Sequence, residues 1–392
     1  MKNEGITYHA VAYPYHKGFA PFIEKKILSL FSSIEICAVC APSGFATAAQ
    51  NASVADNREE MCFMVETDIF PLLESFDTLF VINIENTPYE NFRAKLVSIM
   101  FRAAEMGKNI ITALPLSNIE CKQLMQMCEE LDTELIDLAS TNDSITADQS
   151  ILIESENKKK NHMLSASVVF VGELMEEVHG IDATLSIAEY FMKKGYNTTT
   201  FVDSIMAPLL GMHSTSELFP ENLKPCQTID YINSYLYSVE NKESLDLFII
   251  QIPGGLMKLN DAVANRYGIY SYILSQAIQA DIFVVNVPYD TYNNEFITEL
   301  SNLFSERFCK NIDIINYSNA SINLAALSNY FSLQYYYRDL ISVRKYIDET
   351  FSKSAIPVYC LLLQDDKEAM CRKIEKMLEN YARVSEINIE LR

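Results

Sequence analysis

The residues that most resemble a chemical site form a glycine-containing segment after a short apolar run at 166–171. The segment begins at Gly172 and leads to Asp182 and Thr184, where a helical pattern starts. A strand, a glycine turn and a helix make the usual cradle for phosphate, because the backbone amides at a helix N-terminus attract an anion. A working P-loop reads Gly-x-x-x-x-Gly-Lys-Ser/Thr. This segment has a longer spacing, no lysine and three glutamates, so we expect no ATP hydrolysis. The alternative is a plain turn with Asp182 near the helix N-terminus.

A second glycine segment follows the strongest apolar run, at 245–252. Its notable residues are Pro253, Gly254, Gly255, Met257, Lys258 and Asn260. Ligands in doubly wound folds bind beyond the carboxyl ends of the strands, and glycines let a backbone approach a ligand closely. We expect either a ligand or partner contact here, or a tight turn that requires positive φ.

A third loop, 41–56, also follows an apolar run. Its small polar residues, which suit a substrate or a peptide, are Ser43, Gly44, Asn51, Ser53 and Asp56. The many alanines of this loop are equally compatible with packing against neighbouring structure.

Two of the five histidines lie in loops that could hold a general acid or base. His16, followed by Lys17, comes just after the first apolar run, and His213, followed by Ser214, lies in the turn-rich segment 206–225. A hydrogen-bonded structural histidine is the alternative for each. No histidine pair has the spacing of a metal motif with a carboxylate or thiolate between, so we predict no metal site. No cofactor can be named.

The elements that position these loops alternate between strand and helix. In the first half, apolar runs at 6–13, 34–40, 78–84, 109–114 and 134–138 are spaced by helical patterns. Such alternation predicts a mostly parallel sheet. A polar stretch separates this half from a second set of the same kind. We therefore predict two Rossmann-like α/β domains, at 1–145 and 166–392, joined by a linker at 146–165. The second resembles a degenerate P-loop domain.

The composition excludes several classes of function. The 392 residues carry a net charge of −21, so binding to nucleic acid or to an anionic membrane is disfavoured. No apolar stretch reaches the roughly 20 residues that span a bilayer, and the N-terminus lacks a signal peptide. Nine cysteines, mostly in apolar patterns, indicate reduced thiols and a cytoplasmic location. Cys37 and Cys40 have a redox spacing, but on a strand they point to opposite faces.

Several of these segments, in this order, resemble a known family. They are residues 13–21, the loop at 41–56, residues 211–214 and residues 252–257. Together they are similar to the clostridial peptide maturation system proteins, over roughly residues 8–320. That family is encoded beside radical-SAM peptide-modifying enzymes and short cysteine-containing precursor peptides. Its glycine loop has a lysine near the helix start, where this chain has His179 and Gly180.

The resemblance implies an accessory protein in the maturation of a ribosomally synthesised peptide of bacteriocin-like type. Such a protein would bind the precursor peptide, the radical-SAM maturase or both through the loops at 41–56, 206–225 and 253–260. The competing hypothesis is an enzyme whose degenerate glycine loop binds a nucleotide or another small anionic ligand in a cleft between the domains. A third hypothesis is a homo-oligomer formed through the tyrosines of a predicted helical stretch at 330–337.

Overall fold

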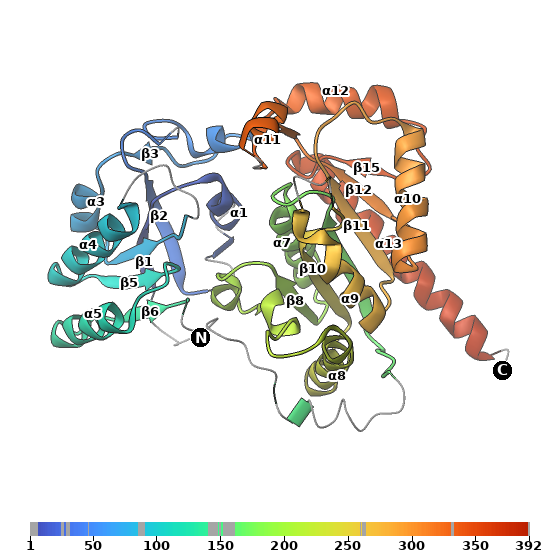
Figure 1. Ribbon diagram of the computed structural model, residues 1–392, viewed down its shortest axis with the longest axis horizontal. Coiled ribbons are helices and arrows are strands. Elements are labelled where there is room, and N and C mark those ends of the chain that lie inside the picture. Colours follow the sequence, from blue (N-terminus) through green and yellow to red (C-terminus); the bar gives the residue numbers. More distant parts are fainter. Residues whose placement is uncertain are drawn as a thin grey trace. The chain divides into compact units, whose positions relative to one another are not determined.

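Figure 1 shows the computed structural model of the chain, which divides into two compact units. The structure describes residues 7–24, 27–28, 32–45, 47–84, 91–139, 148, 150–151, 161–258, 260, 264–330 and 333–390. Unit 1 comprises Met1–Asp143 and Ile205–Gly211, and unit 2 comprises Ser144–Ser204 and Met212–Arg392. The first break lies close to the expected boundary at 145. The short segment 205–211 also belongs to unit 1, although it lay within the predicted second domain.

Unit 1 is built on a parallel sheet with the strand order β3-β2-β1-β4-β5-β6. Its strands are β1 Tyr8–Tyr13, β2 Ile34–Cys40, β3 Val65–Glu66, β4 Thr78–Val81, β5 Asn109–Thr112 and β6 Leu135–Asp137. Its helices are η1 Lys17–Phe19, α1 Ala20–Ile23, η3 Ala52–Ala55, α3 Ile69–Ser75, α4 Phe92–Glu105, α5 Asn118–Glu130 and η4 Ala207–Leu210. This strand order is that of dinucleotide-binding α/β folds, and it reverses direction between β1 and β4.

The core of unit 1 forms because its helices present one apolar face to the sheet. Leu96 and Met100 of α4, spaced one helical turn apart, belong to the same buried cluster as Val11 of β1 and Leu79 of β4. The start of α5 is fixed by a capping box, in which Ser117 and Glu120 satisfy each other's backbone amides. These contacts hold the strands in register and so set the positions of the loops.

Unit 2 is built on a second parallel sheet, with the order β15-β12-β11-β7-β10-β8-β9. Its strands are β7 Ser167–Glu173, β8 Thr198–Val202, β9 His213–Ser214, β10 Leu247–Gly255, β11 Ile282–Val287, β12 Ile314–Tyr317 and β15 Val358–Tyr359. Its helices are α7 Gly180–Lys193, η5 Thr215–Leu218, α8 Pro225–Glu243, η6 Asn265–Gly268, α9 Ile269–Ala277, α10 Asn294–Phe308, α11 Leu324–Tyr330, α12 Leu340–Phe351 and α13 Gln364–Glu390.

Helices cover both faces of the second sheet. In Figure 1, α9 and α10 lie in front of the strands and α7 and α13 lie behind them; α8 packs on α9, and α7 packs on α13. Strands covered in this way are apolar along their length, as all nine residues of β10 and all six of β11 are buried. The α/β fold with mostly parallel sheets is therefore confirmed.

One expectation about secondary structure was wrong. The tyrosine-rich stretch is not helical throughout, because Tyr335–Tyr337 forms β14, which pairs antiparallel with β13 Ala320–Ile322. The alternation of a strand leaves Tyr336 62% exposed, while the hydroxyl of Tyr335 bonds within unit 2. Tyr330 ends α11, and its side chain lies outside the described part. Of the three tyrosines in β14, Tyr336 is therefore the one that is exposed enough to contribute to the proposed tyrosine surface.

Candidate functional site

The carboxylate of Glu173 occupies the turn that was expected to hold an anion. Glu173 is the last residue of β7, and its Oε1 accepts hydrogen bonds from the backbone amides of Val178 and Gly180, both at 2.7 Å. Gly180 is the first residue of α7, so one of the donors is an amide of the helix N-terminus, where an anion is stabilised. An internal side chain thus takes the place that a phosphate would take in a working cradle.

The surroundings of Glu173 change its acidity. The residue is 7% exposed, and burial raises the pKa of its carboxyl to about 7, against the opposing effect of the amides of Gly180 and Val178. The nearby carboxylate of Asp203 acts in the same direction as burial. Burial also raises the pKa of Asp203, although Arg266 opposes this. The cradle therefore holds a group that changes charge near neutral pH.

The glycines of the segment are required by packing against the protein's own side chains. A Cβ on Gly180 would lie 2.7 Å from the Glu173 carboxyl carbon, and a Cβ on Gly172 would lie 2.7 Å from Leu256. The carbonyl of Gly172 accepts a hydrogen bond from the buried amide of Asn286 at 2.9 Å. These glycines allow close internal contacts, and in this structure those contacts are with Glu173 and Leu256.

The second glycine segment differs from the expected loop, because Pro253, Gly254 and Gly255 belong to β10. The register of β10 against β7 shifts after Gln251, so that Gly255 pairs with Glu173. Gly254 has a φ of +71°, which a glycine adopts without strain. The positive φ that the tight-turn alternative requires is present at Gly254, but this residue lies within the strand and not in a turn after it.

Asn265 connects three segments around this edge of the sheet. Its Nδ2 donates to the carbonyls of Leu174 at 2.9 Å and Met257 at 2.6 Å, and its Oδ1 accepts from the amide of Glu176 at 3.3 Å. A Cβ on Gly255 would overlap the Asn265 amide, so the glycine makes room for this hub. Met257 is partly buried, whereas Lys258 and Asn260 are exposed. No motif or spacing in the sequence marks Asn265 as a functional residue.

A left-handed turn follows directly from Asn265. The φ values are +48° for Asn265, +49° for Arg266, +58° for Tyr267 and +62° for Gly268. For residues other than glycine this conformation costs roughly 1–2 kcal/mol each, and such strain is concentrated at functional sites. The Arg266 Nε lies 3.3 Å from Glu176 Oε1, and the Tyr267 ring is 57% exposed.

Asp182 and Thr184 lie in the first turns of α7, and their side chains are used internally. The His179 Nδ1 lies 3.0 Å from Asp182 Oδ2, and its Nε2 lies 3.0 Å from Asn319 Oδ1. All three residues are buried, and a protonated imidazole would satisfy both oxygens. The Thr184 hydroxyl donates to the Gly180 carbonyl at 2.8 Å. These contacts fix the start of α7, and they join it to the segment before β13.

The β13–β14 hairpin contacts the same loop. The Tyr335 hydroxyl donates to the Glu176 carbonyl at 2.5 Å, and the Tyr337 ring lies 6.5 Å from the His179 ring. The loop after β7 is thus held from one side by Asn265 and from the other by the hairpin. We call the exposed and half-exposed residues at this place the carboxyl-edge surface: Glu176, Glu177, Met257, Arg266 and Tyr267.

The segment at 206–225 places His213 and Ser214 in structural roles. His213 lies 2.8 Å from Glu217 Oε2, and this hydrogen bond raises the pKa of the imidazole. Burial alone would raise the pKa of Glu217, but the hydrogen bonds from His213 and Tyr235 lower it. Ser214 forms a capping box with Glu217 at the start of η5. The pair links β9 to α8 through Tyr235.

In unit 1, His16 and Lys17 lie after β1, beside the point at which the strand order reverses. The His16 Nδ1 accepts from the amide of Gly18 at 3.1 Å, and His16 caps η1, which begins at Lys17. In this hydrogen bond Nδ1 is the acceptor, and the imidazole stabilises the start of η1. Ligands commonly bind beside such a point, but the described contacts assign His16 a capping role.

The loop at 41–56 uses most of its polar groups internally. Asn51 accepts from the amide of Ser53 at 3.0 Å and donates to the Met61 carbonyl at 2.8 Å. Asp56 is 2% exposed and forms a buried ion pair with Arg58, whose Nη1 also lies 2.8 Å from Glu24. Ser43 and Gly44 are exposed, and Asn51 is partly exposed.

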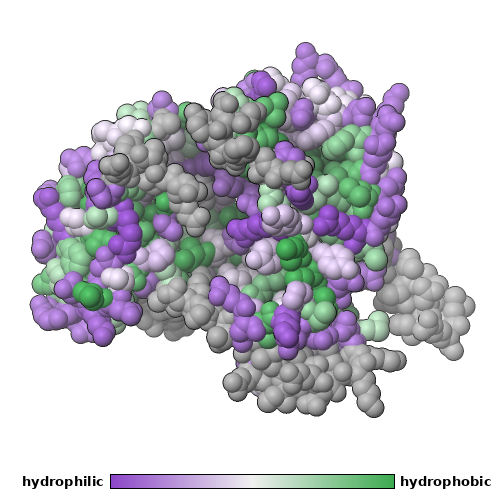
Figure 2. All heavy atoms as spheres, in the orientation of Figure 1, coloured by the Kyte–Doolittle hydropathy of each residue, from purple (hydrophilic) through white to green (hydrophobic). Residues whose placement is uncertain are grey.

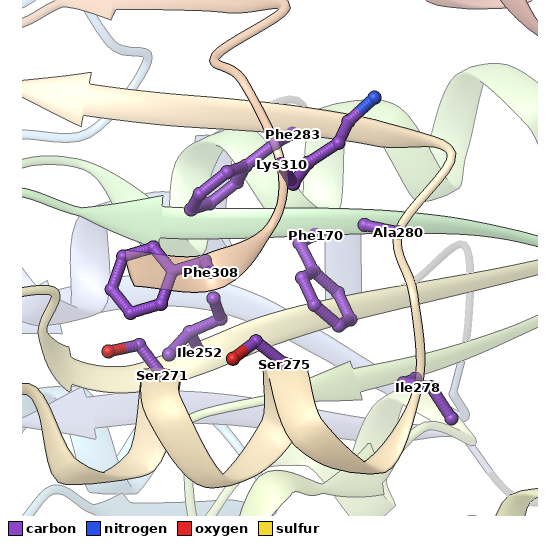
Figure 3. A pocket seen from close by; sticks show the side chains of 9 residues that line it. All are labelled: Phe170, Ile252, Ser271, Ser275, Ile278, Ala280, Phe283, Phe308 and Lys310. Atoms are coloured by element: carbon purple, nitrogen blue, oxygen red, sulfur yellow. The ribbon is translucent and has the colours of Figure 1, made fainter. Parts of the chain in front are cut away.

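A small cavity in unit 2 does not provide a ligand site. Figure 3 shows it between α9 and the sheet, lined mainly by Phe170, Phe283 and Phe308. Its polar groups already have partners: the Ser271 hydroxyl donates to the Gly268 carbonyl at 2.8 Å, and the Lys310 ammonium donates to the Asp281 carbonyl at 2.7 Å. Ligand pockets need unsatisfied polar groups that converge on a ligand, so we interpret this cavity as a packing gap.

Comparisons with known proteins identify the fold alone. No protein-family model matches the chain, and no curated protein does. The chain is similar to a crystal structure of a DUF1611 family protein from Anabaena variabilis, with a TM-score of 0.56 and 12% sequence identity. The match covers 94% of this chain and 99% of that one, so the resemblance extends over both units. Among the described residues, no helix combines the length and the apolar character needed to cross a membrane.

Proposed function

We propose that this protein is a non-hydrolytic binding protein that serves a peptide maturation system as an accessory. It would bind a precursor peptide, or the enzyme that modifies that peptide. The observation that carries the non-hydrolytic part is the position of Glu173, whose carboxylate accepts the amides of Val178 and Gly180. The ionised carboxylate of Glu173 repels a phosphate. The segment supplies no lysine to balance this negative charge.

The binding part of the proposal is supported by the carboxyl-edge surface. It lies beyond the carboxyl ends of β7 and β10, where ligands of parallel sheets bind. It combines a half-exposed arginine and an exposed tyrosine, two residue types that are enriched at binding hot spots. Arg266 and Tyr267 both lie in the left-handed turn, and backbone strain of this kind is concentrated at functional sites.

The choice of a peptide as the partner rests on the resemblance of the ordered sequence blocks to the peptide maturation family. The surface is compatible with this choice, because Glu176, Glu177 and Arg266 offer both signs of charge at one edge. Figure 2 shows the mixed hydrophilic and apolar surface of the face in view, and the net charge of −21 disfavours polyanionic partners.

The anion site that the competing enzyme hypothesis requires is occupied by a side chain of the protein itself. A nucleotide or another small anionic ligand was expected to use the glycine cradle, and Glu173 fills that cradle in the structure. An enzyme of this kind would need an anion site elsewhere. The described contacts of Asp182, Thr184, His213 and Ser214 are internal, and they favour the accessory role.

The proposal is tested by affinity capture from the cytosol of the native organism, with the full chain as bait. We expect the chain to retain a cysteine-containing peptide or a peptide-modifying enzyme, identified by mass spectrometry. Tyr267→Ala should lose this partner, because it removes the exposed ring of the carboxyl-edge surface. Tyr272→Ala is the matched control, since its ring is 49% exposed on α9 outside that surface. Equal capture by wild type and Tyr267→Ala would contradict the proposed surface.

A further inference from the structure

We propose that unit 1 carries a binding site for a divalent transition metal of the zinc class, formed by His9, Glu35 and Cys37. These donors lie on β1 and β2, outside every loop discussed above. The side-chain ligand atoms all lie within 4.8 Å of one another. The proposal is independent of the peptide-maturation role, because it rests on a different unit and on different residues.

The sheet brings the three donors together through its register. His9 of β1 is the direct partner of Glu35 in β2, and the backbone amide of His9 is held by Asp77 Oδ1 at 2.9 Å. Cys37 follows Glu35 by two residues, so both side chains project from the same face of the strand. Two adjacent strands thus present an imidazole, a carboxylate and a thiol on one face.

The distances match those between ligands around a single ion. His9 Nδ1 lies 3.6 Å from Glu35 Oε2 and 3.7 Å from Cys37 Sγ. Metal–ligand bonds of about 2.0–2.3 Å in a tetrahedral zinc site place neighbouring ligand atoms roughly 3.3–3.6 Å apart. The two distances from His9 Nδ1 are close to this separation, and the Glu35 and Cys37 ligand atoms lie within 4.8 Å of each other. The thiol now donates to the Glu35 carbonyl at 3.6 Å, and it would exchange this weak bond for the metal.

The donor set selects the kind of ion. Thiolate and imidazole prefer zinc-like metals to magnesium or calcium, which bind to oxygen. Three protein ligands leave a fourth position for water or another ligand. His9 and Glu35 are the second residues of their strands, toward the sheet end opposite to the ligand-binding edge. A metal here would tie β1 to β2.

The test is metal binding to the full, untagged chain in metal-free buffer. We expect one equivalent of Zn²⁺ to compete with a chromogenic indicator, and one equivalent of Co²⁺ to give a thiolate-to-cobalt charge-transfer band. Cys37→Ser should abolish the band, and both Cys37→Ser and His9→Ala should weaken Zn²⁺ binding by roughly tenfold or more. Cys62→Ser, which alters an exposed cysteine of the same unit, should change neither.

Three results would overturn the proposal: no stoichiometric metal binding by the wild type, an unchanged cobalt band in Cys37→Ser, or loss of the band in Cys62→Ser. Circular dichroism of each variant shows whether it is folded. His9→Ala provides the second ligand variant, because the His9 side chain is 50% exposed and its truncation leaves the core intact.

Discussion

Glu173 is a buried carboxyl whose protonation is coupled to folding. Its pKa rises from an ordinary value of 4.5 to about 7 in the folded chain, so the folded state binds this proton more tightly than the unfolded state. The contribution to stability is therefore greatest below pH 4.5, is lost as the pH rises through about 7, and is constant above that. At about 1.4 kcal/mol per pKa unit, the loss amounts to roughly 3 kcal/mol.

We expect Glu173→Gln to remove this part of the pH dependence. The free energy of unfolding of the wild type should fall by roughly 3 kcal/mol more than that of the variant between pH 4 and pH 8. Urea unfolding at several pH values, followed by circular dichroism, measures the difference. Glu177→Gln changes an exposed glutamate of the same loop and should keep the wild-type profile. Identical profiles for wild type and Glu173→Gln would show that Glu173 does not titrate in this range.

The predicted binding role of Asp56 and its observed ion pair with Arg58 lead to different outcomes when the carboxylate is replaced. Asp56→Asn removes one carboxylate from the buried Arg58 guanidinium, which stays paired with Glu24. Breaking a buried pair from one side is strongly destabilising, and we expect a loss of roughly 3 kcal/mol. Hydrogen exchange of unit 1 measures it. Unchanged exchange together with a loss of partner capture would instead make Asp56 a binding residue.

In the left-handed turn at 265–268, one substitution should change stability and partner binding in opposite directions. Tyr267→Gly should stabilise the chain by about 1 kcal/mol, because glycine adopts a φ of +58° without the steric cost of a side chain. The same change removes the exposed ring and should weaken capture of the partner. Thermal unfolding and affinity capture are measured together. A variant that is less stable than wild type would contradict the assignment of strain to this turn.

The elements themselves could be predicted from the sequence. Apolar runs such as 245–252 and 281–287 correspond to β10 and β11, because strands buried on both faces are continuously apolar. The sequence did not reveal that β10 continues through Gly255, since the register shift depends on the contact with Asn265. It also did not reveal β14, because the pairing partner of a short tyrosine strand is set by tertiary contacts.

The sequence predicts the position of the loop after β7, but it does not predict that Glu173 accepts the amides of this loop. The loop after β7 was identified from its glycine and helix start, and three glutamates were expected to oppose a phosphate. Which glutamate turns inward depends on backbone directions at Val178 and His179, where His179 has a φ of +72°, and no spacing rule encodes this. The donors of the proposed metal site lie 28 residues apart in the case of His9 and Cys37, so only the strand register brings them together.

At the scale of the whole molecule, the match to a DUF1611 structure over 94% of the chain shows a shared fold, and function must be tested separately. We expect a panel of nucleotides to leave the melting temperature unchanged. A bound nucleotide at 100 times its Kd would add about 2.7 kcal/mol of stability, which differential scanning fluorimetry detects. A clear shift with any nucleotide would revive the enzyme hypothesis, and loss of that shift in Asp182→Ala would place the ligand near α7.

The occupancy of the cradle by Glu173 is tested most directly by the amide signal of Gly180. Selective labelling with ¹⁵N-glycine gives signals from only 11 residues. Adding ¹³C-carbonyl histidine identifies the signal of Gly180, because His179-Gly180 is the one His-Gly pair in the sequence. We expect this signal to titrate with a midpoint of about 7, following the carboxyl of Glu173, and to be unaffected by inorganic phosphate at constant pH. A Gly180 signal that shifts with phosphate and is unchanged in Glu173→Gln would show that the cradle is open to an external anion.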